Sequence, residues 1–426
     1  MTLYLSICSG PRSDVIVSRK LGKQKLKFMF CVFALSQVPG DGGNQLEARW
    51  NKSEVVHYLC AKKATWCTLW LDVSEIIAPK AVDCFVDNMR LVYDNKTRST
   101  FNSPGVEVRV PLFGETTPVE YLDPSYVAHS VSKYFLAIVD TLVRIGYERN
   151  KTIRGAPYDF RKAPREYYSN LTKLIEETFE ANEQKVTLIA HSLGAPVLHY
   201  FFIHKTQAWK DKYIESVISL SGAWGGAVKP LKVYAVGDNL GSAWISSSSV
   251  RRLQRSMASL AFLMPSRNIW HEDEVLVETP AANYSLSNIS EYFKVVPYEV
   301  GYEMYKDTKD MLYNAPPPGV EIHCLHGVEV PTTERVIFKE NGNFSKQPTL
   351  ITGDGDGTVN TRSLQYCLQF RGKQKQEIHY KTFESVEHLK ILWSYPALHY
   401  ITSHMQNVSQ KNMLRERQKQ FVKHQN

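Results

Sequence analysis

Residues 185–200 read KVTLIAHSLGAPVLHY, an apolar run followed by a tight turn and a helical pattern. The run over 186–189 predicts a buried strand, and Pro196 suits the first turn of a following helix. A serine at such a turn projects its hydroxyl from the edge of a sheet, beside a backbone N–H that can stabilise an oxyanion. The small residues Ala190 and Gly194 let strand and helix approach closely. The stretch therefore predicts an α/β fold in which Ser192 is a nucleophile.

Two later segments offer the partners that a nucleophilic serine requires. Residues 347–359 read QPTLITGDGDGTV and predict a strand that runs into a turn carrying Asp354 and Asp356. Residues 377–389 read EIHYKTFESVEHL and predict an alternating strand and a loop carrying His388. The histidine would take the Ser192 proton and later return it, while a carboxylate fixes the imidazole tautomer. The order serine, aspartate, histidine is the one that α/β-hydrolases use.

Each of these segments also has a plainer interpretation. The Gly/Asp turn could be only a turn, or a loop that binds a cation, although it lacks the twelve-residue spacing and closing glutamate of an EF-hand. His388 is one of 13 histidines, and most histidines lie on the surface or in satisfied core positions. The ordered set of three is more specific than any one member, and it favours the catalytic interpretation.

Strand and helix patterns alternate through the middle of the chain. Residues 170–182 are amphipathic, a helix is expected at 196–206, and strands are expected at 216–220, 320–325 and 350–352. This alternation predicts a doubly wound, mostly parallel sheet with its functional loops at the carboxyl edge. Because Ser192, Asp356 and His388 each follow such a strand, we expect them to meet at that edge.

Composition indicates one large domain with insertions. The chain has 426 residues, a formal net charge of +8 and 12% aromatic residues. No apolar run reaches the ~18 residues that span a bilayer. Outside residues 12–27 and 411–423 the basic residues are dispersed, without the clusters typical of a nucleic-acid-binding protein. A dispersed positive surface suits anionic lipid, or it serves solubility alone.

Sequons and cysteines indicate an oxidising, secretory route. Asparagines opening an N-x-S/T sequon exceed the about two or three expected by chance. They are Asn51, Asn95, Asn150, Asn170, Asn283, Asn288, Asn343 and Asn407. The cysteines are Cys8, Cys31, Cys60, Cys67, Cys84, Cys324 and Cys367. The sequence alone leaves their pairing open, although disulfides would fit the same compartment.

Several unusual strings resemble the lecithin:cholesterol acyltransferase and lysosomal phospholipase A(2) family of α/β-hydrolases, over about residues 38–405. They are VPGDGGNQLEA at 38–48, VVHYLC at 55–60, RGAPYD at 154–159, AHSLG at 190–194, AWKDKY at 208–213, WGG at 224–226, GDGDGTV at 353–359 and EH at 387–388. The resemblance implies an α/β-hydrolase fold with a cap or lid and a small membrane-binding insertion. It maps the nucleophile onto Ser192, the base onto His388 and the acid onto Asp356 rather than Asp354.

The resemblance also implies roles for residues around this triad. The oxyanion donors would be the backbone N–H groups of Leu193 and Asp41. An aspartate at position 41 resembles the lysosomal phospholipase branch, whereas the plasma cholesterol acyltransferase has a cysteine there. Lys229 and Thr358 would line the head-group end of the site. With His388 they could also hold a zinc ion that blocks the active site, although no cofactor is required.

Disulfides and segment boundaries follow from the same resemblance. Cys60 would pair with Cys84 and Cys324 with Cys367, which leaves Cys67 unpaired or variable. The α/β-hydrolase domain would span residues 37–410, with a membrane-docking insertion at 50–93, cap and lid segments at 94–149 and 223–318, and a basic tail at 411–426. On sequence alone the apolar stretch between Cys60 and Cys84 favours core, whereas the resemblance favours contact with lipid. Residues 237–262 are Ser/Gly-rich, then basic, then apolar, and predict a mobile lid, with the serines at 246–249 in a loop.

The N-terminal segment, residues 1–36, allows three interpretations. Residues 23–36 read KQKLKFMFCVFALS, which resembles a secretory signal with a basic start, a short apolar run and small residues three apart. The family has a buried strand at this place, in which case a signal must lie further upstream. The third interpretation is a mis-joined coding sequence that lacks a short segment.

The function implied by the resemblance is that of a calcium-independent lysosomal phospholipase A and O-acyltransferase. It would form an acyl-enzyme from a glycerophospholipid and pass the acyl group to water or to a lipid alcohol such as ceramide. A sterol acyltransferase with the same triad is the alternative, and a non-catalytic binding protein of this fold is a third possibility that a complete triad disfavours. Expected partners are a phospholipid membrane surface, anionic lipid and an acyl acceptor, with no nucleic acid. We expect a monomer in the lysosome lumen, outside the cell, or both.

Overall fold

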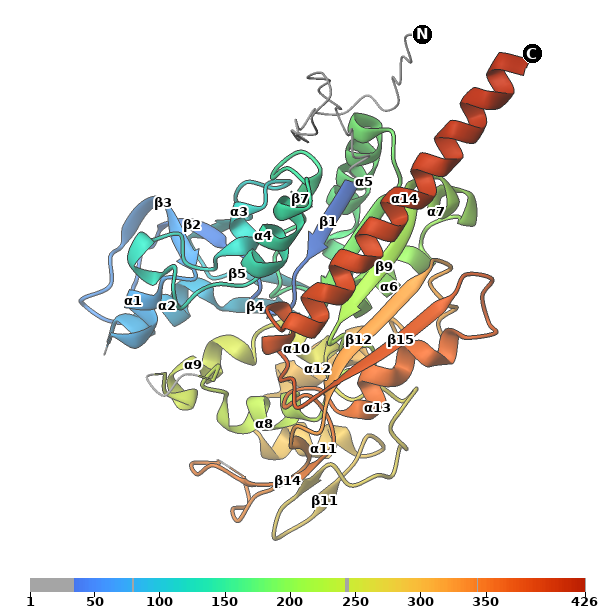
Figure 1. Ribbon diagram of the computed structural model, residues 1–426. Coiled ribbons are helices and arrows are strands. Elements are labelled where there is room, and N and C mark those ends of the chain that lie inside the picture. The colour runs from blue at the N-terminus through green and yellow to red at the C-terminus, as the bar shows by residue number, and fades with distance from the viewer. Residues whose placement is uncertain (1–33, 79, 242–244, 343, 426) are drawn as a thin grey trace.

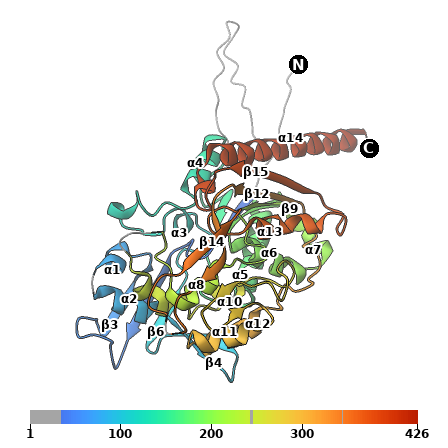
Figure 2. The same ribbon diagram turned by 90° about the horizontal axis from the view of Figure 1, so that it is seen from below.

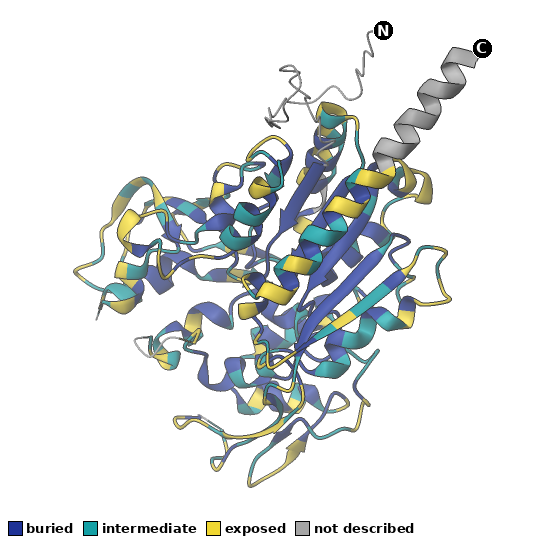
Figure 3. Ribbon diagram, viewed as in Figure 1, coloured by how far each residue is buried: buried dark blue, intermediate teal, exposed yellow. Residues whose placement is uncertain are grey.

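A six-stranded parallel sheet forms the centre of the molecule (Figure 1). The computed structural model describes residues 34–425, except residues 79, 242–244 and 343. Across the sheet the strands are β15 (Ile378–Glu384), β12 (Ile322–Val328), β9 (Ile214–Leu220), β8 (Val186–His191), β1 (Ala34–Val38) and β7 (Ile153–Gly155). Every pairing between these neighbours is parallel. The inner strands β1, β8, β9 and β12 are almost wholly buried, which explains their continuous apolar runs, whereas the edge strand β15 is only partly buried, as Figure 3 shows.

Helices cover both faces of this sheet. On one face lie α4 (Leu136–Arg144) and the long α14 (Tyr395–Gln425), which Figure 2 shows on one side of the strands. The other face packs against α5 (Tyr168–Asn182) and α6 (Gly194–Ile203). Successive residues of β8 alternate between the two cores: Leu188 and Ala190 join α5 and α6, whereas Ile189 joins α4 and α14. This doubly wound arrangement is the α/β-hydrolase fold, as predicted.

Smaller elements surround the central sheet. A three-stranded sheet is formed by β2 (Leu46–Asn51), β3 (Lys63–Trp70) and β6 (Val106–Arg109), and a hairpin by β4 (Leu91–Asp94) and β5 (Ser99–Asn102). A four-stranded sheet holds β10 (Val277–Glu278), β11 (Asn283–Tyr284), β13 (Thr332–Ile337) and β14 (Thr349–Gly353). The remaining helices are α1 (Val73–Ile77), α2 (Ala81–Met89), α3 (Thr117–Glu120), η1 (Tyr126–Ala128), η2 (Pro164–Glu166), α7 (Gln207–Tyr213), α8 (Lys229–Val236), α9 (Ser247–Gln254), α10 (Ala258–Phe262), α11 (Ile289–Val295), α12 (Glu299–Thr308), α13 (Thr361–Leu364), η3 (Gln365–Phe370) and η4 (Lys390–Leu392).

One strand expected in the parallel sheet lies elsewhere. The strand predicted at 350–352 forms as β14, but it pairs antiparallel with β13 in the small sheet. Most of its residues are exposed, whereas a strand inside a parallel sheet is buried on both faces. The edge position beside β12 is taken instead by β15. The turn after β14 still reaches the carboxyl edge of the central sheet, because Asp356 forms a parallel bridge with Val330, just after β12.

Residues 237–262 and the serines at 246–249 were expected to form loops, but the structure shows helices there. Residues 237–262 are not one long loop: they contain α9 and α10, whose Leu253 and Leu260 are buried. The serines at 246–249 lie at the start of α9 rather than in a loop, since Ser246 occupies its N-cap position. Serine is common at helix starts, although the Ser246 hydroxyl lies 2.8 Å from the Ser248 hydroxyl and caps no backbone N–H.

The N-terminal segment is described only from residue 34 onward. Ala34–Val38 form β1, fully buried between β7 and β8. Residues 34–36 are therefore part of a central strand, which favours the strand interpretation over cleavage after residue 36; residues 1–33, with Cys8 and Cys31, lie outside the described residues. Among the described residues, no helix combines the length and the apolar character needed to cross a membrane.

Candidate active site

Ser192 occupies the sharp turn between β8 and α6. Its φ of +55° lies in the left-handed region that residues other than glycine rarely adopt. Such strain at a nucleophile is typical of a strand–turn–helix elbow. A Cβ at Gly194 would come within 2.5 Å of the Val38 carbonyl oxygen, so only glycine fits where α6 passes β1. The sequence prediction for this turn is confirmed.

The three predicted side chains meet at the carboxyl edge of the sheet. Nε2 of His388 lies 2.9 Å from Oγ of Ser192, and Nδ1 of His388 lies 2.7 Å from Oδ2 of Asp356. The backbone N–H of His388 also donates to the Asp356 carbonyl oxygen at 2.8 Å. Asp354 takes no part, because its carboxylate accepts from the Glu329 N–H and the Thr361 hydroxyl. The relay therefore contains the second aspartate of the turn, as expected.

Asp356 is held in its charged form. Complete burial alone would raise the pKa of its carboxyl group, but the His388 ring and backbone amides outweigh that effect, so the pKa is lowered. Its Oδ1 accepts from the N–H groups of Val359 at 2.8 Å and Thr358 at 3.1 Å. These two donors belong to the Gly/Asp turn, so the turn itself stabilises the carboxylate that faces the imidazole.

The turn at residues 39–41 lies against the nucleophile. A Cβ at Gly40 would come within 2.7 Å of the Ser192 Cβ, so the backbone of this turn passes directly over the serine. Asp41 follows immediately, and the buried Leu193 follows Ser192 at the start of α6. Both residues therefore lie where the predicted oxyanion donors belong; their N–H groups as donors stay a prediction.

A buried hydrogen-bonded bridge connects that turn to the catalytic histidine. The Gly40 N–H donates to the Tyr134 hydroxyl oxygen at 3.0 Å, and this hydroxyl lies 2.5 Å from Nδ1 of His191. Nε2 of His191 lies 2.9 Å from the carbonyl oxygen of His388. Burial lowers the pKa of His191 to about 3, with the neighbouring His388 as a smaller cause. The neutral imidazole can thus donate from Nε2 while Nδ1 accepts from the tyrosine.

Sequence reasoning missed Tyr134 and gave His191 no role. Tyr134 lies just before α4, in a segment assigned to the cap, and nothing in the sequence linked it to the serine. His191 directly precedes Ser192, which is the one signal that could have raised it. Their function depends on contacts between segments far apart in the chain.

Asp41, Lys229 and Thr358 are the predicted residues that remain to be placed relative to the relay. Asp41 is exposed by its surface area, but the protein atoms around its carboxyl group desolvate it and raise the pKa to about 6, while the nearby Lys229 charge partly lowers it. Nζ of Lys229 forms an ion pair with Asp238 at 3.3 Å. Thr358 is half-buried beside Asp356. The structure therefore brings both predicted head-group residues near the relay, and their roles, including the inhibitory zinc, stay predictions.

Comparison with known proteins settles the family. The model of the lecithin:cholesterol acyltransferase family matches residues 66–395. The chain belongs to this family. A phosphatidylcholine-sterol acyltransferase of Gallus gallus is 42% identical over 361 residues, covering 84% of this chain and 86% of that protein. A lysosomal phospholipase A and acyltransferase of Rattus norvegicus is 42% identical over 369 residues, covering 85% and 88%. A chain of the Tle4-Tli4 complex has a TM-score of 0.48 at 13% identity, over 89% of this chain and 98% of that one.

Two disulfides expected from the resemblance to the lecithin:cholesterol acyltransferase family are present. Cys60 bonds to Cys84, and Cys324 bonds to Cys367. Cys67 is a free, exposed thiol, as predicted. The second bond joins β12 to η3, so it connects a central strand to the helices that follow the Gly/Asp turn.

Predicted glycosylation and lipid-docking positions lie mostly at the surface. Six sequon asparagines are exposed and Asn288 is half-buried, whereas Asn343 lies outside the described residues. The exposed ones are Asn51, Asn95, Asn150, Asn170, Asn283 and Asn407. In the predicted docking segment Trp70 is buried, and Trp66 is half-buried with the guanidinium groups of Arg49 and Arg109 close to its ring. The segment is therefore partly core, while lipid contact stays a prediction.

Proposed function

We propose that this chain is a calcium-independent phospholipase A and O-acyltransferase. The observation that carries the proposal is the unbroken relay from the Ser192 hydroxyl through His388 to a buried, charged Asp356. The family relatives include proteins named lysosomal phospholipase A and acyltransferase at 41–42% identity over most of this chain. The chemistry assigned to these residues requires no metal or other cofactor.

The relay accounts for both halves of the reaction. His388 accepts the Ser192 proton as Oγ attacks the ester carbonyl of a glycerophospholipid, and the negative charge moves to the carbonyl oxygen. The N–H groups of Leu193 and Asp41 stabilise that oxyanion. His388 then returns the proton to the leaving glycerol oxygen, and lysophospholipid departs. Water, or a lipid hydroxyl such as that of ceramide, is deprotonated by His388, attacks the acyl-enzyme and restores Ser192.

A sterol acyltransferase is the second candidate function. The Gallus gallus relative with the name phosphatidylcholine-sterol acyltransferase is as similar, at 42% identity, as the phospholipase relative of Rattus norvegicus. The triad is common to both reactions, so only the acceptor distinguishes them. Asp41 favours the phospholipase, because its branch of the family resembles this chain at that position.

The proposed setting is the lumen of the lysosome, or the outside of the cell, at a phospholipid membrane that contains anionic lipid. The net charge of +8 suits a negatively charged surface. Apolar side chains are exposed around the first disulfide, where they could insert among lipid head groups. They are Val56, Tyr58, Leu59 and Ile77. We propose a monomer, glycosylated at some of the exposed sequons.

The test is product analysis with purified protein on liposomes of mixed neutral and anionic phospholipid, with chelator present. Free fatty acid is expected, together with acylceramide when ceramide and cholesterol are both added as acceptors; cholesteryl ester without acylceramide would then support the sterol alternative. Ser192→Ala should abolish both products and labelling by a fluorophosphonate probe. Ser219→Ala is the matched control, because the Ser219 hydroxyl is buried without a hydrogen-bond partner among the described residues. Equal activity of wild type and Ser192→Ala would refute the proposal.

A further inference from the structure

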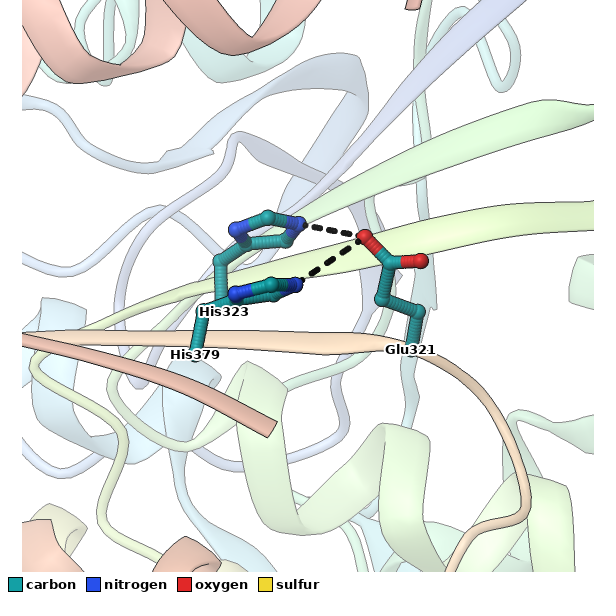
Figure 4. A group of neighbouring side chains, drawn as sticks. All are labelled: Glu321, His323 and His379. Atoms are coloured by element: carbon teal, nitrogen blue, oxygen red, sulfur yellow. Dashed lines mark hydrogen bonds and ion pairs between the residues drawn. The ribbon is translucent and has the colours of Figure 1, made fainter. Parts of the chain in front are cut away.

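Three potential metal ligands gather at the amino ends of β12 and β15, as Figure 4 shows. Glu321 directly precedes β12, His323 is the second residue of β12, and His379 is the second residue of β15. The two histidines are register partners in this parallel pair, and their rings stack with centroids 4.4 Å apart. Both rings point one nitrogen toward the same carboxylate oxygen of Glu321.

We propose that Glu321, His323 and His379 form a binding site for a divalent transition-metal ion, with zinc as the best fit. Oε1 of Glu321 lies 3.0 Å from Nε2 of His323 and 3.4 Å from Nε2 of His379. Two ligands bound tetrahedrally at zinc's usual bond length are themselves about 3.3 Å apart. The three donor atoms all lie within 4.8 Å of one another. The two imidazole planes are nearly parallel, at 16°, and each lone pair lies in its ring plane, so the part-exposed His379 ring must turn before both nitrogens face one ion.

Neighbouring groups orient the cluster and add a further possible ligand, which a simple ion pair does not require. Nδ1 of His323 lies 2.8 Å from the Tyr400 hydroxyl, which fixes the ring so that Nε2 faces Glu321. Oε2 of Glu377 lies 3.4 Å from Nε2 of His379 and offers a further oxygen.

Access and position indicate a structural ion. His323 is almost fully buried, whereas the His379 and Glu321 side chains are 38% and 33% exposed, so an ion can enter from solvent. The neighbouring His404 is not counted as a ligand, because its Nε2 lies 3.0 Å from the Ser216 hydroxyl. Since β12 and β15 run from this cluster toward the catalytic edge, the site lies at the opposite edge of the sheet. An ion here would link the edge strand β15 to β12 and stabilise their pairing, and it would leave the reaction at Ser192 unchanged.

The experiment is a zinc titration of the full-length, metal-free protein by calorimetry, with Co²⁺ absorption in the visible range as a second readout. Wild type should bind one equivalent, show the intense bands of tetrahedral cobalt and gain thermal stability. His379→Gln and Glu321→Gln should each weaken binding by at least about tenfold. Both residues are part-exposed, so these variants should fold. His271→Gln, which removes an exposed histidine outside the cluster, should bind as wild type does.

One further variant separates this site from zinc at the catalytic histidine. His388→Ala should keep the binding event, although it loses ester hydrolysis. Absence of saturable binding by wild type would overturn the proposal. So would equal binding by wild type, His379→Gln and Glu321→Gln, or loss of the event in His388→Ala with retention in His379→Gln.

Discussion

Tyr134→Phe tests whether the buried bridge positions the catalytic machinery. The change keeps the aromatic ring and removes only the hydroxyl. The Gly40 N–H then loses its acceptor and Nδ1 of His191 loses its partner, both inside the protein. Phenylalanine fits the same space, so the packing of Tyr134 against its neighbour Phe135 should persist. The effect should therefore fall on the placement of the turn at Gly40 and of the backbone at His388.

The size of the effect follows from the groups left without partners. A buried donor without an acceptor costs about 1–3 kcal/mol. If that cost appears in the transition state, where the turn must hold the oxyanion, kcat falls by about 5- to 150-fold. Because Tyr134 is buried behind the turn, KM should change little. His191, with a pKa of about 3, stays neutral above about pH 4, so the loss should be the same at acidic and neutral pH.

The assay is the hydrolysis of phospholipid in liposomes, with kcat and KM measured at several pH values above about 4. Tyr234→Phe is the matched control, because Tyr234 is fully buried and its hydroxyl has no hydrogen-bond partner among the described residues. Its kcat should equal that of wild type. The reasoning is refuted if Tyr134→Phe keeps the wild-type kcat, or if the loss lies wholly in KM.

Three more predictions concern single residues or bonds. Asp356→Asn should lower kcat by about 10⁴-fold, because an amide favours the wrong imidazole tautomer, whereas Asp354→Asn should remain active; comparable losses in rate assays would contradict the geometry. The pKa of Asp41 is raised to about 6, so its carboxyl group becomes charged as pH rises through that value, and only about 3% of it is neutral at pH ~7.5. The negative charge should then oppose the developing oxyanion. Asp41→Asn should therefore hold kcat/KM through neutral pH, and an unchanged pH profile would exclude this role. Replacing Cys324 and Cys367 by serine should lower the free energy of unfolding by about 2–4 kcal/mol in denaturant titrations, and an unchanged midpoint would contradict this.

The catalytic centre was predictable from the sequence because its local signals are strong. The run before Ser192 is buried on both faces, and Gly194 is required by the close approach of the Val38 and Pro39 carbonyl oxygens. The family resemblance separated Asp356 from Asp354, a choice that spacing alone could not make. The structure shows the reason for that choice: Asp354 closes the turn through Thr361, while Asp356 faces the imidazole.

Membership of the central sheet was less predictable. The sequence of β14 is a short, partly apolar run and that of β15 is a short alternating one, and neither contains a long apolar run. Whether β14 or β15 pairs with β12 depends on contacts between segments that are distant in the sequence. The hydrophobic pattern within one strand does not show which strand it will pair with. The two helices within residues 237–262 were missed for a similar reason. Their apolar residues become a buried face only once α2 and α12 are in place against them.

The proposed metal site had a sequence signal that only the register makes meaningful. The tripeptide Glu-Ile-His occurs twice, at 321–323 and at 377–379, each time at the start of a strand. Two copies of so short a string carry no weight in the sequence alone. Because β12 pairs with β15 so that 322 faces 378 and 323 faces 379, the copies lie side by side, and equivalent side chains point to the same face. The carboxyl ends of these two strands lead to the relay, so one strand pair would serve catalysis at one end and metal binding at the other.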